Sequence, residues 1–356
     1  MRPSTSTRAR GLLFTLTASL GTAVLASGAM ADGEGGPSPD GHAPAGVMVD
    51  HMHKAGEFMV GYRFMYSRQD GDMLHGTDAV SDQEVISKAC GTHGHGCAMK
   101  PDEMVMKMHM LDIMYAPTDW LTLMVMPQWM SMDMTMSPLE GAHGDDHHAG
   151  HGHDVSGFGD TTFGALVQLW EAPGHHLHAG LNFSAPTGSV DEKGSDGNFL
   201  HYGMQLGSGT WDFLPSLTYT GHADGWSWGA QLSGVKRLDK QNDSGFAFGD
   251  IFQATAWTGY RLTHWLSASV RVVYTEQGEI EGHFAGGHNH HSPPDLQPNY
   301  GGRFWDVGFG INAVVPDGAL KGHRLSVEWL EPVQDDVNGY QLERDGTLFV
   351  SWSKAF

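Results

Sequence analysis

The chain has 356 residues and a formal net charge of −21 at pH 7. This acidity excludes a nucleic-acid partner, which would need basic surfaces, and favours the attraction of cations. Beyond the first 31 residues, no apolar run approaches the roughly 20 residues of a membrane-spanning helix, so the sequence excludes a helical membrane protein.

Residues 1–31 have the pattern of a secretory signal peptide. Arg2, Arg8 and Arg10 precede an apolar stretch over 11–25, and Ala29-Met30-Ala31 supplies a cleavage site before Asp32. The alternative is an uncleaved membrane anchor. Removing the three arginines changes the net charge from −21 to −24. An exported chain of this charge indicates an extracytoplasmic protein.

Residues 32–53 form a leader before the first expected strand. Its Pro- and Gly-rich start predicts a flexible segment. It ends in Asp50-His51-Met52-His53, which we place at the periplasmic mouth of the protein. His51 and His53 are candidate metal ligands, and an ordinary polar approach to the first strand is the alternative.

Residues 54–356 contain many segments of about 10 residues with period-two alternation, typical of transmembrane β-strands. In the segment over 302–315, for example, Trp305, Val307 and Phe309 share one side while Asp306 and Gly308 share the other. Charge is costly against lipid, so the polar side faces the lumen. We predict an all-β, antiparallel up-and-down barrel of about twelve strands, over residues 56–66, 104–115, 121–132, 158–170, 175–185, 205–220, 226–237, 250–262, 265–276, 302–315, 323–331 and 345–356.

The links between these strands alternate in length, as in outer-membrane barrels with short periplasmic turns and long extracellular loops. The chain ends in Phe356 on an alternating strand, which resembles the signal read by the barrel-assembly machinery, although Lys354 departs from that pattern. A soluble secreted β-protein is the alternative. The expected long loops cover 67–103, 133–157, 186–204, 238–249, 277–301 and about 332–344.

Cys90 and Cys97 are the only two cysteines. In an oxidising compartment a local disulfide is the expected outcome. The alternative is a metal-thiolate role.

Eleven of the twenty methionines fall between Met104 and Met136, mostly at alternate positions. Alternate strand residues share a face. Because Leu121, Leu123 and Val125 suit lipid, we expect the methionines to line the lumen, which leaves Lys107 and His109 near the outer rim or beside a bulge. Thioethers favour Cu(I) but are also adaptable apolar filler. The candidate ligands are Met106, Met108, Met110, Met114, Met124, Met126 and Met130.

Histidines gather in the expected extracellular loops, where imidazole suits Cu(II) or Zn(II). Their spacing matches no defined zinc site, and a soluble Gly-rich loop with adventitious affinity is the alternative. The candidate ligands here are His143, His147, His148, His151, His153, His288, His290 and His291.

The chain shows no nucleophile elbow, phosphate loop or triad spacing, so we do not expect an enzyme. No cofactor is firmly indicated beyond the possibility of copper.

Several stretches together resemble one known family. The chain is similar to outer-membrane transporter-like barrels grouped with the meta-pathway phenol-degradation proteins. The resemblance implies a barrel in the outer membrane of a Gram-negative bacterium, in contact with its lipid, but no proven substrate. The Cys90–Cys97 insert and the His-rich loops are unusual for the family. The matching stretches are 46–54, 106–119, 159–162, 185–189, 204–212 and 320–325.

Three functions follow from these features. The first is a channel that binds or passes copper or other transition-metal ions through a Met-lined lumen. The second is a porin-like channel for small apolar or aromatic solutes. The third is a structural or partner-binding barrel.

Overall fold

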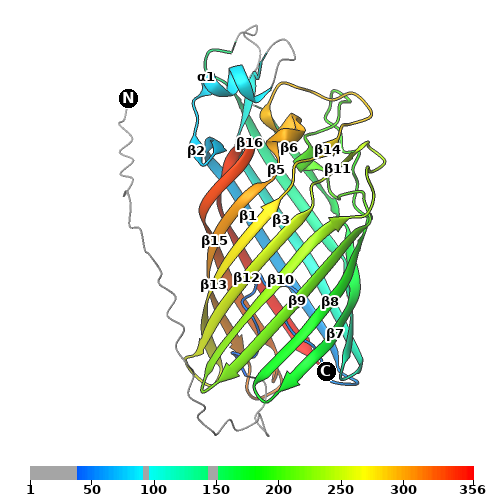
Figure 1. Ribbon diagram of the computed structural model, residues 1–356, viewed down its shortest axis with the longest axis vertical. Helices are drawn as coiled ribbons and strands as arrows, with labels where there is room; N and C mark the ends of the chain where they lie inside the picture. Colours follow the sequence, from blue (N-terminus) through cyan, green and yellow to red (C-terminus); the bar gives the residue numbers. More distant parts are fainter. Residues whose placement is uncertain (1–37, 91–95, 143–150) are drawn as a thin grey trace.

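The computed structural model describes residues 38–90, 96–142 and 151–356. The predicted signal peptide 1–31 lies outside them, as do His143, His147 and His148. The described chain is a tall barrel, with its long loops at one end and its short turns at the other (Figure 1). Its wall contains β1 (Phe58–Gly76), β3 (Met99–Thr118), β4 (Leu121–Met126), β5 (Gln128–Pro138), β6 (His151–Phe158), β7 (Thr161–Ala172), β8 (His175–Ala185), β9 (Asp212–Ala223), β10 (Trp226–Arg237), β12 (Ile251–Arg261), β13 (Leu266–Gln277), β15 (Gly302–Val314) and β16 (Arg324–Ala355).

Antiparallel pairing closes this sheet on itself, because β1 pairs with both β16 and β3. The main chains of Phe58 and Phe356 exchange hydrogen bonds of 2.8 and 3.2 Å at the seam. Closure leaves no open edge in the membrane, which a lipid-exposed backbone requires.

The predicted all-β transmembrane barrel is therefore confirmed. At three places the strand labels do not correspond one to one with crossings of the wall. β4 and β5 are halves of one strand interrupted at Pro127, which cannot donate a backbone hydrogen bond. β6 and β7 are likewise halves of one strand, interrupted at Gly159-Asp160. β16 contains two antiparallel arms, one pairing with β15 and one with β1, around Asn338-Gly339. Within the described ranges the wall thus has the twelve crossings expected.

Several strands extend beyond their predicted ends into the expected loops. β1 continues to Gly76, β5 ends at Pro138 and β6 begins at His151, which shortens the loops expected over 67–103 and 133–157. The loop expected over 332–344 was wrong, because those residues lie within β16. Conversely, 205–211 precede β9 rather than belonging to it. Strand pairing needs no apolar side chain, so the wall continues into water after the lipid-facing pattern has ended.

The extracellular end carries the remaining short elements, and none of the described helices is long and apolar enough to cross a membrane. These elements are β2 (Asp78–Ala79), α1 (Asp82–Glu84), η1 (Val85–Ala89), η2 (Tyr202–Met204), β11 (Phe246–Ala247), β14 (Glu281–Gly282), η3 (Pro293–Asp295) and η4 (Gln297–Asn299).

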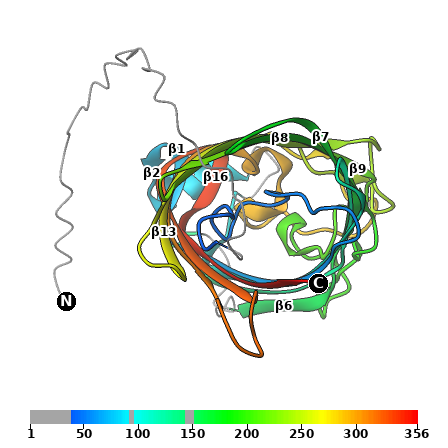
Figure 2. The same cartoon turned by 90° about the horizontal axis from the view of Figure 1, so that it is seen from below.

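Residues 38–53, here called the plug, run inside the barrel. Figure 2 shows this dark blue segment crossing the lumen when the barrel is viewed from the short-turn end. Its main chain is held by side chains from opposite walls, as when Gln231 of β10 donates to the Met48 carbonyl at 2.8 Å and Arg63 of β1 to the Val47 carbonyl at 3.0 Å. The described part of the expected flexible leader is thus an ordered internal segment in the periplasmic half of the barrel.

Candidate functional site

The methionines of β3, β4 and β5 form one interior surface, here called the methionine wall. Their side chains are buried or half-buried, whereas intervening residues such as Leu111 and Leu123 are more than 40% exposed on the lipid side. Strand register places thioethers directly opposite one another, where cross-strand side chains touch. The facing pairs are Met104 with Met134, Met106 with Met132, Met108 with Met130, and Met114 with Met124.

Lys107 and His109 occupy positions whose side chains point to the lipid side of the wall. The strand has no bulge there, because β1 and β3 stay in register past them. His109 shares a hydrogen bond of 2.6 Å with the Tyr62 hydroxyl, and Lys107 lies 4.0 Å from Asp133. Tyr62 thus gives the His109 imidazole a hydrogen-bond partner on the outer surface. The strand therefore keeps its alternation of inward and outward side chains.

A cavity of about 450 Å³ lies in the lumen against the extracellular half of the methionine wall, and we call it the chamber. Its far side carries aromatic rings from β15, β16 and the loops. Arg344 also lines it, but its guanidinium pairs with Asp335 at 2.6 Å and Asp306 at 2.8 Å. The chamber combines apolar surface with polar groups, as small-molecule sites do. Its other polar side chains are Gln69, Gln205, Thr275, Gln277, Asn299 and Gln341. Its Met and aromatic residues are Met73, Met104, Met106, Met130, Met132, Met134, Phe248, Tyr300, Phe304 and Tyr340.

The methionine wall continues from the chamber towards the plug. A buried cluster in this lower part packs against Met48 and Met52 of the plug itself. Thioether side chains therefore extend from the chamber to the plug along one wall. The buried members of the cluster include Met59, Met110, Met114, Met124 and Met126.

Directional polar bonds hold the plug. Glu328 of β16 accepts from the Gly46 amide at 2.7 Å and pairs with Arg271 of β13 at 2.8 Å, and both side chains are at most 3% exposed. Arg63 of β1 donates to the carbonyls of Ala45 and Val47. These contacts fix the plug at one height and in one orientation.

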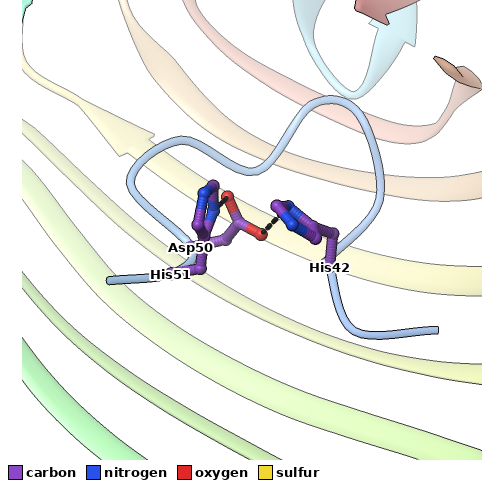
Figure 3. Close-up of side chains that lie close together, drawn as sticks. All are labelled: His42, Asp50 and His51. Atoms are coloured by element: carbon purple, nitrogen blue, oxygen red, sulfur yellow. Dashed lines mark hydrogen bonds and ion pairs between the residues drawn. The ribbon is translucent and has the colours of Figure 1, made fainter. Parts of the chain in front are cut away.

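His51 and His53, the candidates from the leader, lie in the plug, with their ring centroids 4.9 Å apart. Figure 3 shows His51 with His42 and Asp50. Asp50 stands between two imidazoles, with one oxygen 2.9 Å from Nδ1 of His51 and the other 3.6 Å from Nδ1 of His42. Burial lowers the pKa of His42 well below its ordinary value. Burial alone would raise the pKa of Asp50, but the facing His51 and His42 hold it well below its ordinary value.

The loop histidines that the structure describes are only partly brought together. His153 and His291 line one cavity of about 660 Å³ with His201 and Asp295. Asp295 accepts hydrogen bonds from the His291 amide and from Ser292, and shares one of 2.7 Å with His201, so it organises the loop. His288 contacts the Asp295 carbonyl and lies beside His290, with ring centroids 5.1 Å apart. Only the main chain of His151 is described, in β6 opposite Met136.

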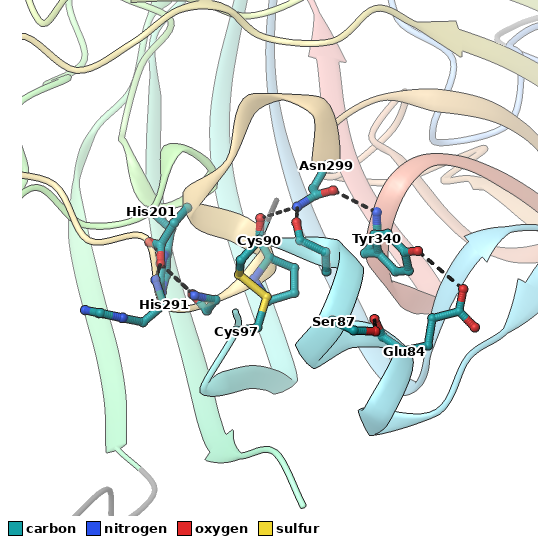
Figure 4. The surroundings of a disulfide bond; sticks show 12 residues. Glu84, Ser87, Cys90, Cys97, His201, His291, Asn299 and Tyr340 are labelled. Carbon is teal, nitrogen blue, oxygen red and sulfur yellow. Dashed lines mark hydrogen bonds and ion pairs between the residues drawn. A yellow bond between two sulfur atoms is a disulfide. The ribbon is translucent and has the colours of Figure 1, made fainter. Parts of the chain in front are cut away.

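Cys90 and Cys97 form a disulfide with a Cα–Cα distance of 5.2 Å at the extracellular end (Figure 4). Asn299 of η4 donates to the Ala89 carbonyl at 3.1 Å and accepts from the Tyr340 amide at 2.9 Å. Because Asn299 and Tyr340 also line the chamber, η1 and the disulfide at its end form part of the chamber's cover.

Sequence reasoning missed His42 and the Arg271–Glu328 pair. Glu328 was visible as an inward-facing charge on an alternating strand, but its partner lies 57 positions away. His42 lies in a Pro- and Gly-rich stretch, and only the bend of the plug brings it to Asp50.

The fold resembles solved outer-membrane barrels. An outer-membrane channel from Pseudomonas putida F1 is 17% identical, with a TM-score of 0.56 over 86% of this chain and 98% of that one. The TodX monoaromatic hydrocarbon channel, as a deletion mutant, is 13% identical, with a TM-score of 0.44 over 88% and 93% of the two chains. A FadL homologue from Pseudomonas aeruginosa is 9% identical, with a TM-score of 0.37 over 84% and 89%.

No curated protein matches the chain. A family model does match residues 128–322, which is more than half of the sequence. The resemblance noted from the sequence is thereby confirmed. The chain belongs to the family described as "Putative MetA-pathway of phenol degradation", and its fold is that of a Gram-negative outer-membrane channel.

Proposed function

We propose that this protein is an outer-membrane channel that takes small, largely apolar organic solutes into its methionine-lined chamber. The observation that carries the proposal is the chamber itself: a lumenal cavity of about 450 Å³ walled by thioethers on one side and aromatic rings on the other. Barrel lumens are usually polar. Flexible methionine side chains adapt to ligands of different shape and favour contact with aromatic rings.

Two polar groups of the chamber, the Tyr300 hydroxyl and the Arg344 guanidinium, are compatible with the same function. The Tyr300 hydroxyl donates to the Pro294 carbonyl at 2.6 Å, and Arg344 is paired with two carboxylates. These groups already have partners within the protein. An apolar solute that covers them therefore leaves neither of them buried without a partner. The family description refers to phenol degradation, which fits an apolar ring with at most a small polar substituent.

The plug lies between the chamber and the periplasm. It contacts opposite walls of the lumen through Gln231 of β10 and Arg63 of β1. A solute in the chamber reaches the periplasm only when the plug moves or when the lumen opens beside it. The proposed channel is therefore a gated one, in which binding in the chamber precedes passage.

A second candidate function is the binding or passage of soft metal ions, Cu(I) above all, on the same wall. The facing thioether pairs, such as Met106 with Met132, favour it. Soft metals select thioether ligands, and a row of weak sites allows an ion to move from one to the next. Cu(II) or Zn(II) on the loop histidines, including His153, His288, His290 and His291, belongs to this candidate.

One pair of titrations separates the two candidates. Met104, Met106, Met130, Met132 and Met134 are replaced together by leucine, which keeps apolar volume but removes sulfur. Such swaps usually cost under about 1.5 kcal/mol each. The refolded wild type and variant are titrated with an apolar fluorescent naphthylamine and, separately, with Ag(I) as a redox-stable substitute for Cu(I).

We expect the naphthylamine to bind both proteins with dissociation constants within about threefold, since leucine preserves the apolar wall. Absence of naphthylamine binding to the wild type contradicts the organic-solute function. Tight Ag(I) binding to the wild type that disappears in the variant supports the metal candidate, and equal Ag(I) binding to both removes it from the chamber part of the methionine wall.

A further inference from the structure

We propose that the plug contains a site for a borderline first-row divalent cation of the Zn(II), Ni(II) or Cu(II) class, formed by His42, Asp50 and His51. One ligand atom from each of these residues can be chosen so that all three lie within 4.8 Å of one another. This site is separate from the methionine wall, uses other ligands and favours a different class of metal. It does not depend on the proposed channel substrate.

The donor set fits that class of cation. Two imidazoles and a carboxylate are ligands that Zn(II), Ni(II) and Cu(II) share, whereas Cu(I) favours thioethers. In a tetrahedral zinc site with bonds of about 2.0–2.1 Å, ligand atoms lie about 3.3 Å apart. The three donors therefore need to close by only about 1–1.5 Å. Because His42 and His51 are both on the plug, this closure needs no movement of the barrel wall.

Buried ring nitrogens without partners are the second observation. Nε2 of His51 and Nε2 of His53 are buried, and neither has a hydrogen-bond partner. The His53 side chain is 6% exposed, and its ring centroid lies 4.9 Å from that of His51. A buried polar atom without a partner is costly. A cation ligated through Nε2 of His51 would satisfy that nitrogen, and Nε2 of His53 is available as a fourth ligand.

The surroundings leave room and compensating charge. A cavity of about 140 Å³ is lined by His42, Asp50 and His51 from the plug and by His176 of β8. Nε2 of His176 is also buried without a partner. Asp112 of β3 borders a second small cavity beside the cluster. Arg324 is the main opposing charge nearby, and it donates to the Ser38 carbonyl at 2.7 Å.

The position of the site gives it a structural effect. His42 and the Asp50-His51 pair stand at the two ends of the bend over residues 43–49, whose carbonyls and amides hold the plug to the wall. A cation that binds both ends of the bend would hold them together, as a structural metal does. It would thereby stabilise the seated plug. Metal supply would then favour the closed channel.

The test uses the refolded mature protein and Zn(II) alone. To remove background, the candidate loop histidines are first replaced by alanine, giving a loop-variant parent. They are His143, His147, His148, His151, His153, His288, His290 and His291. On this parent we compare His42→Ala/His51→Ala with Asp50→Asn, which keeps both imidazoles and nearly the same shape. Zn(II) affinity is measured by competition with a chromogenic chelator, and gel mobility before and after heating verifies that each barrel is folded.

We expect the parent to retain one tight Zn(II) equivalent, the double variant to bind at least 100-fold more weakly, and Asp50→Asn to bind about 10–100-fold more weakly. We also expect Zn(II) to slow amide hydrogen exchange over residues 43–50 in the parent but not in the double variant. A parent that binds no Zn(II), or a folded double variant that binds it as tightly, overturns the proposal. Binding without any change of exchange in the plug overturns it too, because it places the ion elsewhere.

Discussion

The two halves of the lumen are built from different interactions. The chamber half presents thioethers and aromatic rings, whose packing is non-directional, together with amides such as those of Gln205 and Gln341, and its one guanidinium is paired internally. The plug half combines the apolar packing of Met48 and Met52 with carboxylates, guanidinium groups and amides that make directional hydrogen bonds to the plug. The difference indicates a division of labour: the chamber adapts to what enters, whereas the plug has one seated position.

Among the contacts of the plug half, we expect the buried Arg271–Glu328 ion pair to contribute most to stability. Replacing Glu328 by alanine leaves a buried, unpaired guanidinium and removes the acceptor of the Gly46 amide. We expect a loss of about 3–5 kcal/mol in the free energy of unfolding, measured in urea on the refolded barrel. The Arg271→Ala/Glu328→Ala double variant is the control, and it should lose less than Glu328→Ala alone. A loss under about 1 kcal/mol in the single variant would mean that the pair does not hold the plug half together.

The disulfide belongs to the chamber's cover. Its removal should therefore increase local unfolding at the extracellular end of the barrel and not in the plug. Cys90→Ser/Cys97→Ser opens a short loop, for which the chain-entropy model gives about 2.5 kcal/mol. We expect faster amide exchange in α1 and η1, with exchange in the plug unchanged. Faster exchange in both regions would show that cover and plug are not independent.

We expect binding in the chamber to be sensitive to polarity rather than to shape. Met132 is 1% exposed and lines the cavity. Its replacement by glutamine puts an amide into an apolar wall, so we expect naphthylamine affinity to fall about tenfold, which is about 1.4 kcal/mol. Met132→Leu is the matched control and should bind as the wild type does. Equal loss in both variants would indicate shape-specific packing instead.

Single hydrogen bonds to the plug should have the smallest effect. Gln231 donates to the Met48 carbonyl at 2.8 Å and to Thr218 at 2.9 Å. Gln231→Ala should cost about 1–2 kcal/mol in unfolding free energy, and amide exchange near Met48 should accelerate. If exchange there stays at the wild-type rate, the plug is held without this contact.

Much of the barrel could be predicted because its pattern is local. Alternation along a strand such as 302–314 is fixed by lipid on one side, and the structure shows that alternation in burial. The inward direction of the methionines followed from the same rule, since Leu121, Leu123 and Val125 took the other face. Beyond the lipid-facing part of the wall this rule gives no pattern. Residues 332–344 were predicted as a loop from their polar composition, although the strands continue through them.

The interior could not be predicted in the same way, because its contacts join residues far apart in the chain. The plug has the composition of a flexible leader, and its order comes from acceptors and donors on β1, β10 and β16 that no local pattern reveals. The approach of His42 to Asp50 depends on this folding, so only His51 and His53 were identifiable beforehand.

The central claim, that the barrel admits apolar solutes through its chamber, is tested most directly by entry of a small aromatic solute into liposomes. Liposomes containing the wild type, the Met132→Gln variant or no protein are compared under one gradient. We expect entry to be fastest with the wild type, slower with Met132→Gln and slowest in empty liposomes. Entry with the wild type that is no faster than into empty liposomes would contradict the account.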